Sequence, residues 1–289
     1  MTQYTPDEIL EMARQQLSER KTQVVEARTS RETPWRYAFL GVIGAALVAL
    51  LFWPGTPLNW KMYAVVHGVC AQIHNVELGG VQLPICARNT GIYSSFLLTL
   101  LLLVALGRGR ASKLPPLPIT VLLIVFVIIM GVDGVNSMLL DMLLPHLYTP
   151  VNWLRTLTGT GMGITIAVLL LMVFNLSLRA HPEIETRVLK NWWELAAVLG
   201  VNLLVLAAMY GNISFMYWPI AFSAWLGITG VLYGVNVLVT SLAMGYDGRV
   251  VQLSQLAKPA TLAVVFTGIE LALMASIRFW AEGQGLIVG

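Results

Sequence analysis

Charged residues are scarce in this sequence. Asp, Glu, Lys and Arg together make up 11% of the 289 residues, while 57% are hydrophobic and the mean hydropathy is +0.73. A soluble domain carries about 25% charged residues, so the composition excludes an ordinary soluble protein. The net charge of +3 is too small to indicate a nucleic-acid partner, and none is expected.

Signatures of the common enzyme classes are missing as well. The sequence contains no G-x-S-x-G, no H-E-x-x-H and no P-loop, the patterns of hydrolases, zinc proteases and nucleotide-binding proteins. The run TGTGMG at 158–163 opens an apolar stretch and follows no strand, so we do not interpret it as a nucleotide loop. The four histidines include no pair spaced for haem b ligation. These absences leave the enzyme question open and assign no cofactor.

Long apolar runs are present instead. A helix needs about 20 mainly apolar residues to cross the hydrocarbon core of a bilayer. Seven runs meet or nearly meet this length: 37–54, 91–107, 117–140, 159–178, 194–211, 215–244 and 259–281. We therefore predict an all-α, polytopic membrane protein with about seven transmembrane helices in contact with membrane lipids.

The basic residues predict an orientation. With seven spans, fourteen of the 18 Lys and Arg residues fall on the side of the N-terminus, and only Lys61, Arg88, Arg155 and Arg278 fall on the other side. Basic residues near span ends stay cytoplasmic. The pattern predicts a cytoplasmic N-terminus and an extracytoplasmic C-terminus in the cell (inner) membrane.

Three segments are expected along the chain. Residues 1–36 predict a cytoplasmic amphipathic helix that begins at Thr5 and extends to about Ala27, either near the membrane surface or docked on another membrane subunit. Residues 37–178 form a four-span unit and residues 179–289 a three-span unit.

Reactive side chains gather between the first two spans. The stretch HGVCAQIHNVELGGVQLPICARNTGIY, residues 67–93, holds both cysteines and two of the four histidines. A helix is predicted from Leu58 to about His74, and its spacing would place His67, Cys70 and His74 on one face.

Four interpretations of this stretch remain open. Cys70 and Cys86 would face an oxidising compartment, where structural disulfides form. His67, Cys70, His74 and Cys86 are also ligand types for zinc, but their spacing is loose and we assign no metal. A reactive thiol or redox pair and buried inert thiols are the other two interpretations.

Two blocks of the sequence resemble an uncharacterised prokaryotic family of predicted membrane proteins, a domain of unknown function. The first block reads H-x2-C-x-Q from His67, then L-P-I-C-A-R-N-T-G-I-Y from Leu83. The second reads D-G from Asp133, then N-W-L-R-T-L-T-G from Asn152. The chain departs from the family pattern at Ala71 and Asn89, where the family has His and Cys.

The resemblance supplies no established activity and implies only that these residues form a site. The expected ligand-binding residues are His67, Cys70, Gln72, Cys86, Arg88, Asp133, Asn152 and Arg155.

Charge chemistry is expected at the outer end of the third span. Asp133 lies there within an apolar run, and an ionisable residue at that depth usually has a partner inside the bundle. Arg88 and Arg155 each precede a Thr-Gly pair at the start of a span. We expect Asp133 to pair with Arg155, with Arg88 as the alternative partner, either as a packing device or as part of a site for an anionic or zwitterionic group.

Glu270 lies near the middle of the last span. A carboxylate there should be protonated, paired or facing water, with Asn202, Tyr233 and Asn236 as candidate partners. It would serve either as a proton or cation relay or as a packing hydrogen bond.

Close helix packing is expected at two small-x3-small patterns. Gly159 and Gly163 form one pattern and Gly230 and Gly234 the other; this spacing lets membrane helices approach closely.

The sequence favours an integral membrane protein with an outward-facing polar pocket that binds or transports a small ligand or ion, alone or as a subunit of a larger complex. One alternative is a membrane enzyme that acts at the outer face on a lipid, quinone or thiol through Cys70 or His67. Another is a structural or scaffold subunit.

Overall fold

The computed structural model describes residues 6–70 and 74–286 of the chain. Its helices are α1 (Pro6–Phe52), α2 (Leu58–Val66), α3 (Ala87–Ala105), α4 (Leu117–Asp141), α5 (Asn152–Leu178), α6 (Trp192–Tyr210), α7 (Tyr217–Ala243) and α8 (Ala257–Gly283). Short 3-10 turns cover His67–Val69, Ser214–Met216 and Leu253–Leu256, and the strands are β1 (Glu77–Leu78), β2 (Val81–Gln82), β3 (Ala111–Lys113) and β4 (Glu183–Arg187).

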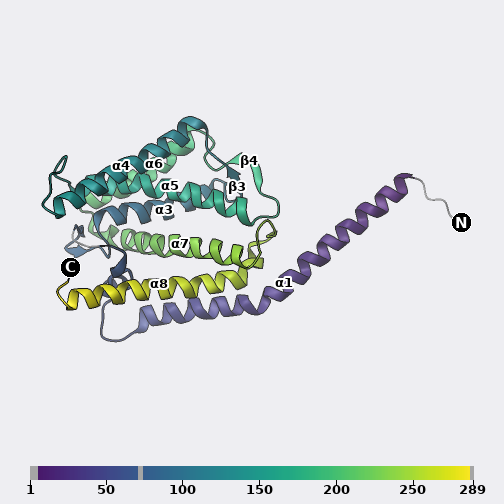
Figure 1. The fold of residues 1–289 in the computed structure, drawn as a ribbon, viewed down its shortest axis with the longest axis horizontal. Helices are drawn as coiled ribbons and strands as arrows, with labels where there is room; N and C mark the ends of the chain where they lie inside the picture. Colours follow the sequence, from purple (N-terminus) through teal and green to yellow (C-terminus); the bar gives the residue numbers. More distant parts are fainter. Residues whose placement is uncertain (1–5, 71–73, 287–289) are drawn as a thin grey trace.

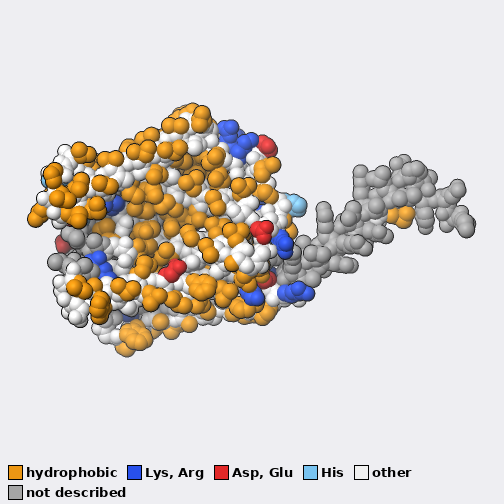
Figure 2. Space-filling view, in the orientation of Figure 1, with side chains coloured by type: hydrophobic (Ala, Val, Ile, Leu, Met, Phe, Trp, Pro, Cys, Tyr) orange, Lys and Arg blue, Asp and Glu red, His pale blue; other side chains and the backbone are white. Residues whose placement is uncertain are grey.

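Within the described residues, seven helices are long and apolar enough to cross a membrane. They run side by side, with the C-terminus at one end of the bundle and β3 and β4 at the other (Figure 1). Hydrophobic side chains cover the visible face along the length of these helices (Figure 2). The predicted class of an all-α polytopic membrane protein is confirmed.

The N-terminal segment and the first span form one helix. α1 is 47 residues long and continues through Pro34 without interruption. The sequence had suggested a separate helix ending near Ala27, but no helix end lies there. Figure 1 shows the first part of α1 reaching well beyond the bundle.

The loop helix between the first two spans is shorter than predicted. α2 ends at Val66, and after one 3-10 turn Cys70 takes an extended conformation with φ −145° and ψ 149°. The expectation that His67, Cys70 and His74 share a helical face is therefore wrong, because the helical spacing stops before Cys70.

α3 and α5 pack backbone against backbone. A Cβ atom on Gly163 would lie 2.0 Å from the carbonyl oxygen of Ile92, and one on Gly159 would lie 2.3 Å from that of Arg88. A Cβ on Gly91 would likewise meet the carbonyl of Thr156. The predicted role of the Gly159–Gly163 pattern is confirmed.

The second glycine pattern makes looser contacts. A Cβ on Gly230 would come no closer than 3.5 Å to Phe96, and one on Gly234 would lie 3.0 Å from Leu170. The close approach on α7 occurs instead at Gly227, where a Cβ would be 1.9 Å from the carbonyl oxygen of Tyr93.

At the end of the bundle opposite the C-terminus, two loops join through β3 and β4. The strands pair in parallel, with Ala111 opposite Glu183. The side chain of Asn175, at the end of α5, donates to the carbonyls of Gly109 and Ala111. This pairing could not be predicted from the sequence, because the strands are short and lie within charged loops.

α1 lies against α8 (Figure 1). Glu32, buried to 6% exposure, accepts hydrogen bonds from the backbone N–H of Lys258 at 2.7 Å and the hydroxyl of Tyr246 at 2.6 Å. The hydroxyl of Thr261 donates to the carbonyl of Trp35. The first span is thus held by the last one, although a boundary between units at 178 and 179 stays a prediction.

Candidate functional site at the Arg88 end of the bundle

The candidate site lies where α3 and α5 begin and α4 approaches its end, which we call the Arg88 end. Neither of the preceding residues, Cys86 and Val151, caps its helix with a side chain. The first turns of both helices therefore present backbone N–H groups. Buried charges gather at this point.

Asp133 forms an ion pair with Arg88. The Nη2 atom of Arg88 lies 2.7 Å from Oδ2 of Asp133, and its Nε lies 3.1 Å from the same oxygen. Nη2 also donates to the backbone carbonyl of Asp133 at 3.1 Å. Asp133 is 1% exposed, so the arginine compensates a fully buried carboxylate.

Two hydroxyl groups complete the surroundings of this carboxylate. Tyr148 donates to Oδ1 of Asp133 at 2.6 Å, and Thr158 donates to Oδ2 at 3.2 Å. Burial, and after it the hydrogen bond to Asp133, raise the pKa of Tyr148 to about 12. The phenol therefore stays protonated and remains a donor at physiological pH.

Arg155 does not pair with Asp133, so that prediction is wrong. Its Nε lies 3.4 Å from Oγ of Ser137, and its Nη1 donates to Oδ1 of Asn152 at 3.0 Å. The residue is 4% exposed, and its buried Nη2 has no hydrogen-bond partner among the residues that the structure describes. Arg88 takes this place instead, since both its Nε and its Nη2 contact the carboxylate of Asp133.

Ser137 brings the two guanidinium groups together. Its Oγ accepts from Nη2 of Arg88 at 2.7 Å and from Nε of Arg155 at 3.4 Å. Sequence reasoning did not single out Ser137, Tyr148 or Thr158. Ser137 lies one helical turn after Asp133, a spacing that places both on one face and could have indicated it.

Neighbouring amides fix the surrounding loops. Asn152 donates to the carbonyl of Asn75 at 3.0 Å. Asn136 donates to the carbonyl of Tyr148 at 2.8 Å and accepts from the backbone N–H of Leu147 at 2.7 Å. The loop that carries Tyr148 is thereby held against α4.

Cys70 and Cys86 lie together beside this network. Both are thiols in the structure, and the backbone N–H of Cys86 donates to Sγ of Cys70 at 3.4 Å. A hydrogen bond to Cys70, and next to it burial, raise the pKa of the Cys86 thiol. The predicted disulfide between them stays a prediction, and Gln72 lies outside the described residues.

Residues 70–169 match a family described as "Predicted membrane protein (DUF2085)". This segment, which we call the DUF2085 segment, is similar to that family. No curated protein and no solved structure matches the chain. The family resemblance that we inferred from the sequence is confirmed over this segment, which contains Cys70, the Arg88–Asp133 pair and Arg155.

The two histidines between the first spans do not share one centre. His67, just before the DUF2085 segment, lies with Nε2 2.7 Å from Oε2 of Glu282 and stacks on Phe279 with ring centres 4.2 Å apart. His74 contacts Asp141 at 3.0 Å. Among the described residues, no group of three or more His, Cys, Asp or Glu side chains could hold a metal ion.

Glu270 also lies outside the DUF2085 segment. Asn236 donates from Nδ2 to Oε2 of Glu270 at 2.8 Å and to the hydroxyl of Thr267 at 3.0 Å. Asn202, another expected partner, contacts Thr99 at 3.2 Å instead. Glu270 was expected to be protonated, paired or facing water, and the structure gives it a polar partner, Asn236 on α7.

Proposed function

We propose that this integral, multi-pass membrane protein binds a small anionic group at the Arg88 end of the bundle. The observation that carries the proposal is the Nη2 atom of Arg155, which is buried and lacks a hydrogen-bond partner among the described residues. A buried donor without a partner is costly. An anion would supply the missing acceptor.

The charge balance at the Arg88 end supports the same ligand class. Arg88 and Arg155 share Ser137, yet among the described residues the one carboxylate in an ion pair with either guanidinium is Asp133, which pairs with Arg88. The next acid on α4, Asp141, contacts His74. A buried charge left without compensation destabilises a protein, so a bound anion would stabilise Arg155.

A planar guanidinium recognises carboxylates and phosphates through paired hydrogen bonds. The N-termini of α3 and α5 add backbone N–H groups and a favourable dipole for an anion. We therefore place a carboxylate or phosphate group of a small molecule beside Arg155.

The site is proposed to face the extracytoplasmic side of the inner membrane. Of the 18 basic residues, the four on this side are Lys61, Arg88, Arg155 and Arg278, and the positive-inside rule puts the opposite end in the cytoplasm. A ligand would then enter from outside the cell, whether for binding alone or for transport.

The enzyme alternative, in which Cys70 or His67 is the reactive group, is less well supported, because His67 contacts Glu282 and Phe279 and Cys70 is buried beside Cys86. A nucleophilic cysteine needs a thiolate at working pH, and hence a lowered pKa. The hydrogen bond to Cys70 and the burial of Cys86 raise its pKa instead.

Thermal unfolding of the purified protein with sulfate or acetate, at constant ionic strength set by chloride, tests anion binding. A ligand that binds only the folded state raises Tm with its concentration. We expect such a rise for the natural chain and its loss in Arg155→Gln. The matched control is Arg179→Gln, because Arg179 is a buried arginine at the opposite end of α5.

The control variant should keep the response to the anions. Equal rises in Tm for the natural chain and Arg155→Gln would contradict a site at Arg155. No rise with either anion in the natural chain would favour the scaffold alternative, in which the polar network only fixes helix packing.

A further inference from the structure

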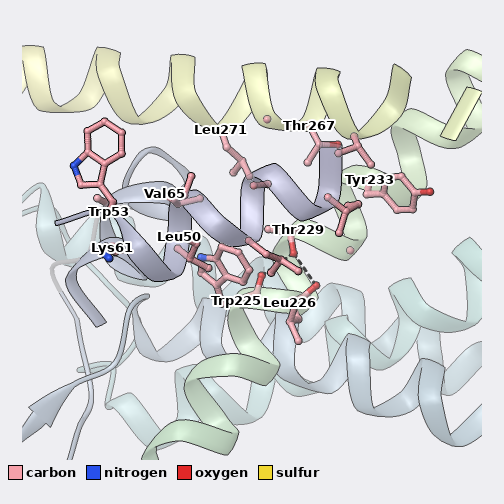
Figure 3. Close-up of a pocket in the computed structure, with 18 of the residues that line it drawn as sticks. Leu50, Trp53, Lys61, Val65, Trp225, Leu226, Thr229, Tyr233, Thr267 and Leu271 are labelled. Atoms are coloured by element: carbon pink, nitrogen blue, oxygen red, sulfur yellow. Dashed lines mark hydrogen bonds between the residues drawn. The ribbon is translucent and has the colours of Figure 1, made fainter. Parts of the chain in front are cut away.

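A second, separate feature of the molecule is an apolar cavity of about 1050 Å³ between α1, α2, α7 and α8. Most of its lining comes from helices long and apolar enough to span the membrane. Figure 3 shows Trp53 and Lys61 toward one end of the cavity and Tyr233 and Thr267 toward the other. The cavity therefore runs along the membrane-spanning helices.

Two hydroxyl groups in the lining are occupied by the protein, whereas the buried Nε1 of Trp225 has no hydrogen-bond partner among the described residues. The hydroxyl of Thr229 donates to the carbonyl of Trp225 at 3.0 Å, and that of Thr267 accepts from Asn236 at 3.0 Å. The remaining lining is formed mainly by Leu, Val, Ile, Ala, Phe and Trp side chains. The body of the cavity thus offers a ligand mainly apolar contact, with Nε1 of Trp225 as a hydrogen-bond donor.

Lys61 is the one charged residue in the lining. Its Nζ donates to the carbonyl of Leu51 at 3.2 Å, and it forms no ion pair with a described residue. Trp53, 68% exposed, and Trp60, 45% exposed, lie at the same end. Tryptophan is enriched at the level of lipid headgroups, which places the Lys61 ammonium at that depth.

We propose that this cavity holds one acyl chain of an anionic phospholipid, with the headgroup phosphate beside Lys61. The bilayer supplies this ligand at high concentration, and the cavity is at the upper end of the range of small-molecule pockets, about 300–1,000 Å³. A lysine near the membrane surface favours an anionic headgroup over a zwitterionic one. This inference does not depend on the anion site at Arg155.

Native mass spectrometry of the full chain, purified with phosphatidylglycerol or phosphatidylcholine, tests the assignment. We expect one phosphatidylglycerol to remain bound after excess lipid is removed with detergent. Gly268→Leu should abolish this retention, because Gly268 lines the cavity and a Cβ there meets no atom within 4 Å. The added side chain would project into space that the acyl chain occupies.

Gly200→Leu is the matched control. Gly200 is also a helical glycine whose Cβ would meet nothing within 4 Å, but it does not line the cavity. This variant should retain the lipid. If Gly268→Leu does not fold, Gly230→Leu tests the same cavity from α7.

Lys61→Gln tests the headgroup. It should lower the affinity for phosphatidylglycerol about fivefold, the effect of losing one lysine at a membrane surface, and Lys61→Arg should restore it. Equal retention of both lipids by the natural chain would overturn the headgroup assignment. Unchanged retention in both cavity-filling variants, or a dimer that these variants dissociate, would overturn the proposal that a lipid occupies the cavity.

Discussion

Helices α3 and α5 pack in close contact, whereas the sector formed by α1, α7 and α8 packs around a cavity. In the DUF2085 segment, glycines bring the backbones of α3 and α5 into direct contact, and a Cβ on Gly163 would lie 2.0 Å from a carbonyl oxygen. Between α1, α7 and α8, by contrast, a cavity of about 1050 Å³ remains. A Cβ on Gly268 in this sector meets nothing within 4 Å.

This difference explains where each region can hold a ligand. Backbone contact leaves no room between α3 and α5, and the charged side chains of these two helices, Arg88 and Arg155, lie at the end of the pair beside Asp133 of α4. The sector around the cavity has room along its length but few polar groups. The first region therefore suits a small anion, and the second an apolar chain.

The largest effect is expected at the buried ion pair. Asp133→Asn and Arg88→Gln should each lower the free energy of unfolding by ~3–5 kcal/mol, because each leaves a charge without its partner, and the double variant should recover much of the loss. Unfolding in mixed detergent micelles measures the cycle.

An exposed ion pair provides the control for this cycle. Glu185, 84% exposed at its side chain, contacts Lys113 at 2.7 Å, and Glu185→Gln should leave the free energy of unfolding close to that of the natural chain, because solvent screens an exposed pair. Additive losses for Arg88 and Asp133 would show that the two side chains do not interact.

A disulfide between Cys70 and Cys86 would rank next, since closing a loop of about 15 residues contributes about 3 kcal/mol in the entropic account. We expect both residues to resist alkylation in denatured, unreduced protein and to react after reduction. Full labelling without a reductant would exclude the disulfide.

In the reduced, folded protein the raised pKa of Cys86 should make its labelling slow at pH 8 and faster as pH rises, because the thiolate is the reacting form.

Tyr148→Phe should have a smaller effect. The variant removes one hydrogen bond to a charged group, which is worth about 1.5–3 kcal/mol, while Arg88 and Thr158 still contact Asp133. The loss should disappear in the Asp133→Asn background, where the acceptor is no longer charged. Chemical unfolding of the four proteins measures this coupling.

The smallest effect is expected at Glu270, in the sector of the cavity. Glu270→Gln keeps an oxygen that accepts from Asn236, and a hydrogen bond between membrane helices averages about 0.6 kcal/mol. Unfolding measurements should therefore find the variant close to the natural chain. A loss of several kcal/mol would show that the carboxylate itself is required.

Hydropathy was sufficient to predict the spans, because crossing a bilayer demands long apolar runs. The partner of Asp133 could not be predicted in the same way. Arg88 and Arg155 each precede a Thr-Gly pair at the start of a helix. The sequence therefore does not distinguish them as partners of Asp133. The choice depends on how α4 is rotated against α3, which is a property of the packed bundle.

The early end of α2 could not be predicted from the sequence for a related reason. The apolar spacing continues past Val66, yet the helix ends there and His67 turns to Phe279 and Glu282 on α8. The contact with α8 is distant in sequence and overrides the local pattern. The cavity could likewise not be predicted from the sequence, since its volume depends on how four helices pack together rather than on any one of them.

The contrast between tight and open packing is tested most directly by two alanine substitutions. Gly163→Ala should lower the free energy of unfolding by about 1–3 kcal/mol, because the new methyl group overpacks the α3–α5 contact. Gly268→Ala should leave stability within about 0.5 kcal/mol of the natural chain. Unfolding of both variants in the same detergent decides the matter. Equal losses, or a larger loss for Gly268→Ala, would contradict the account.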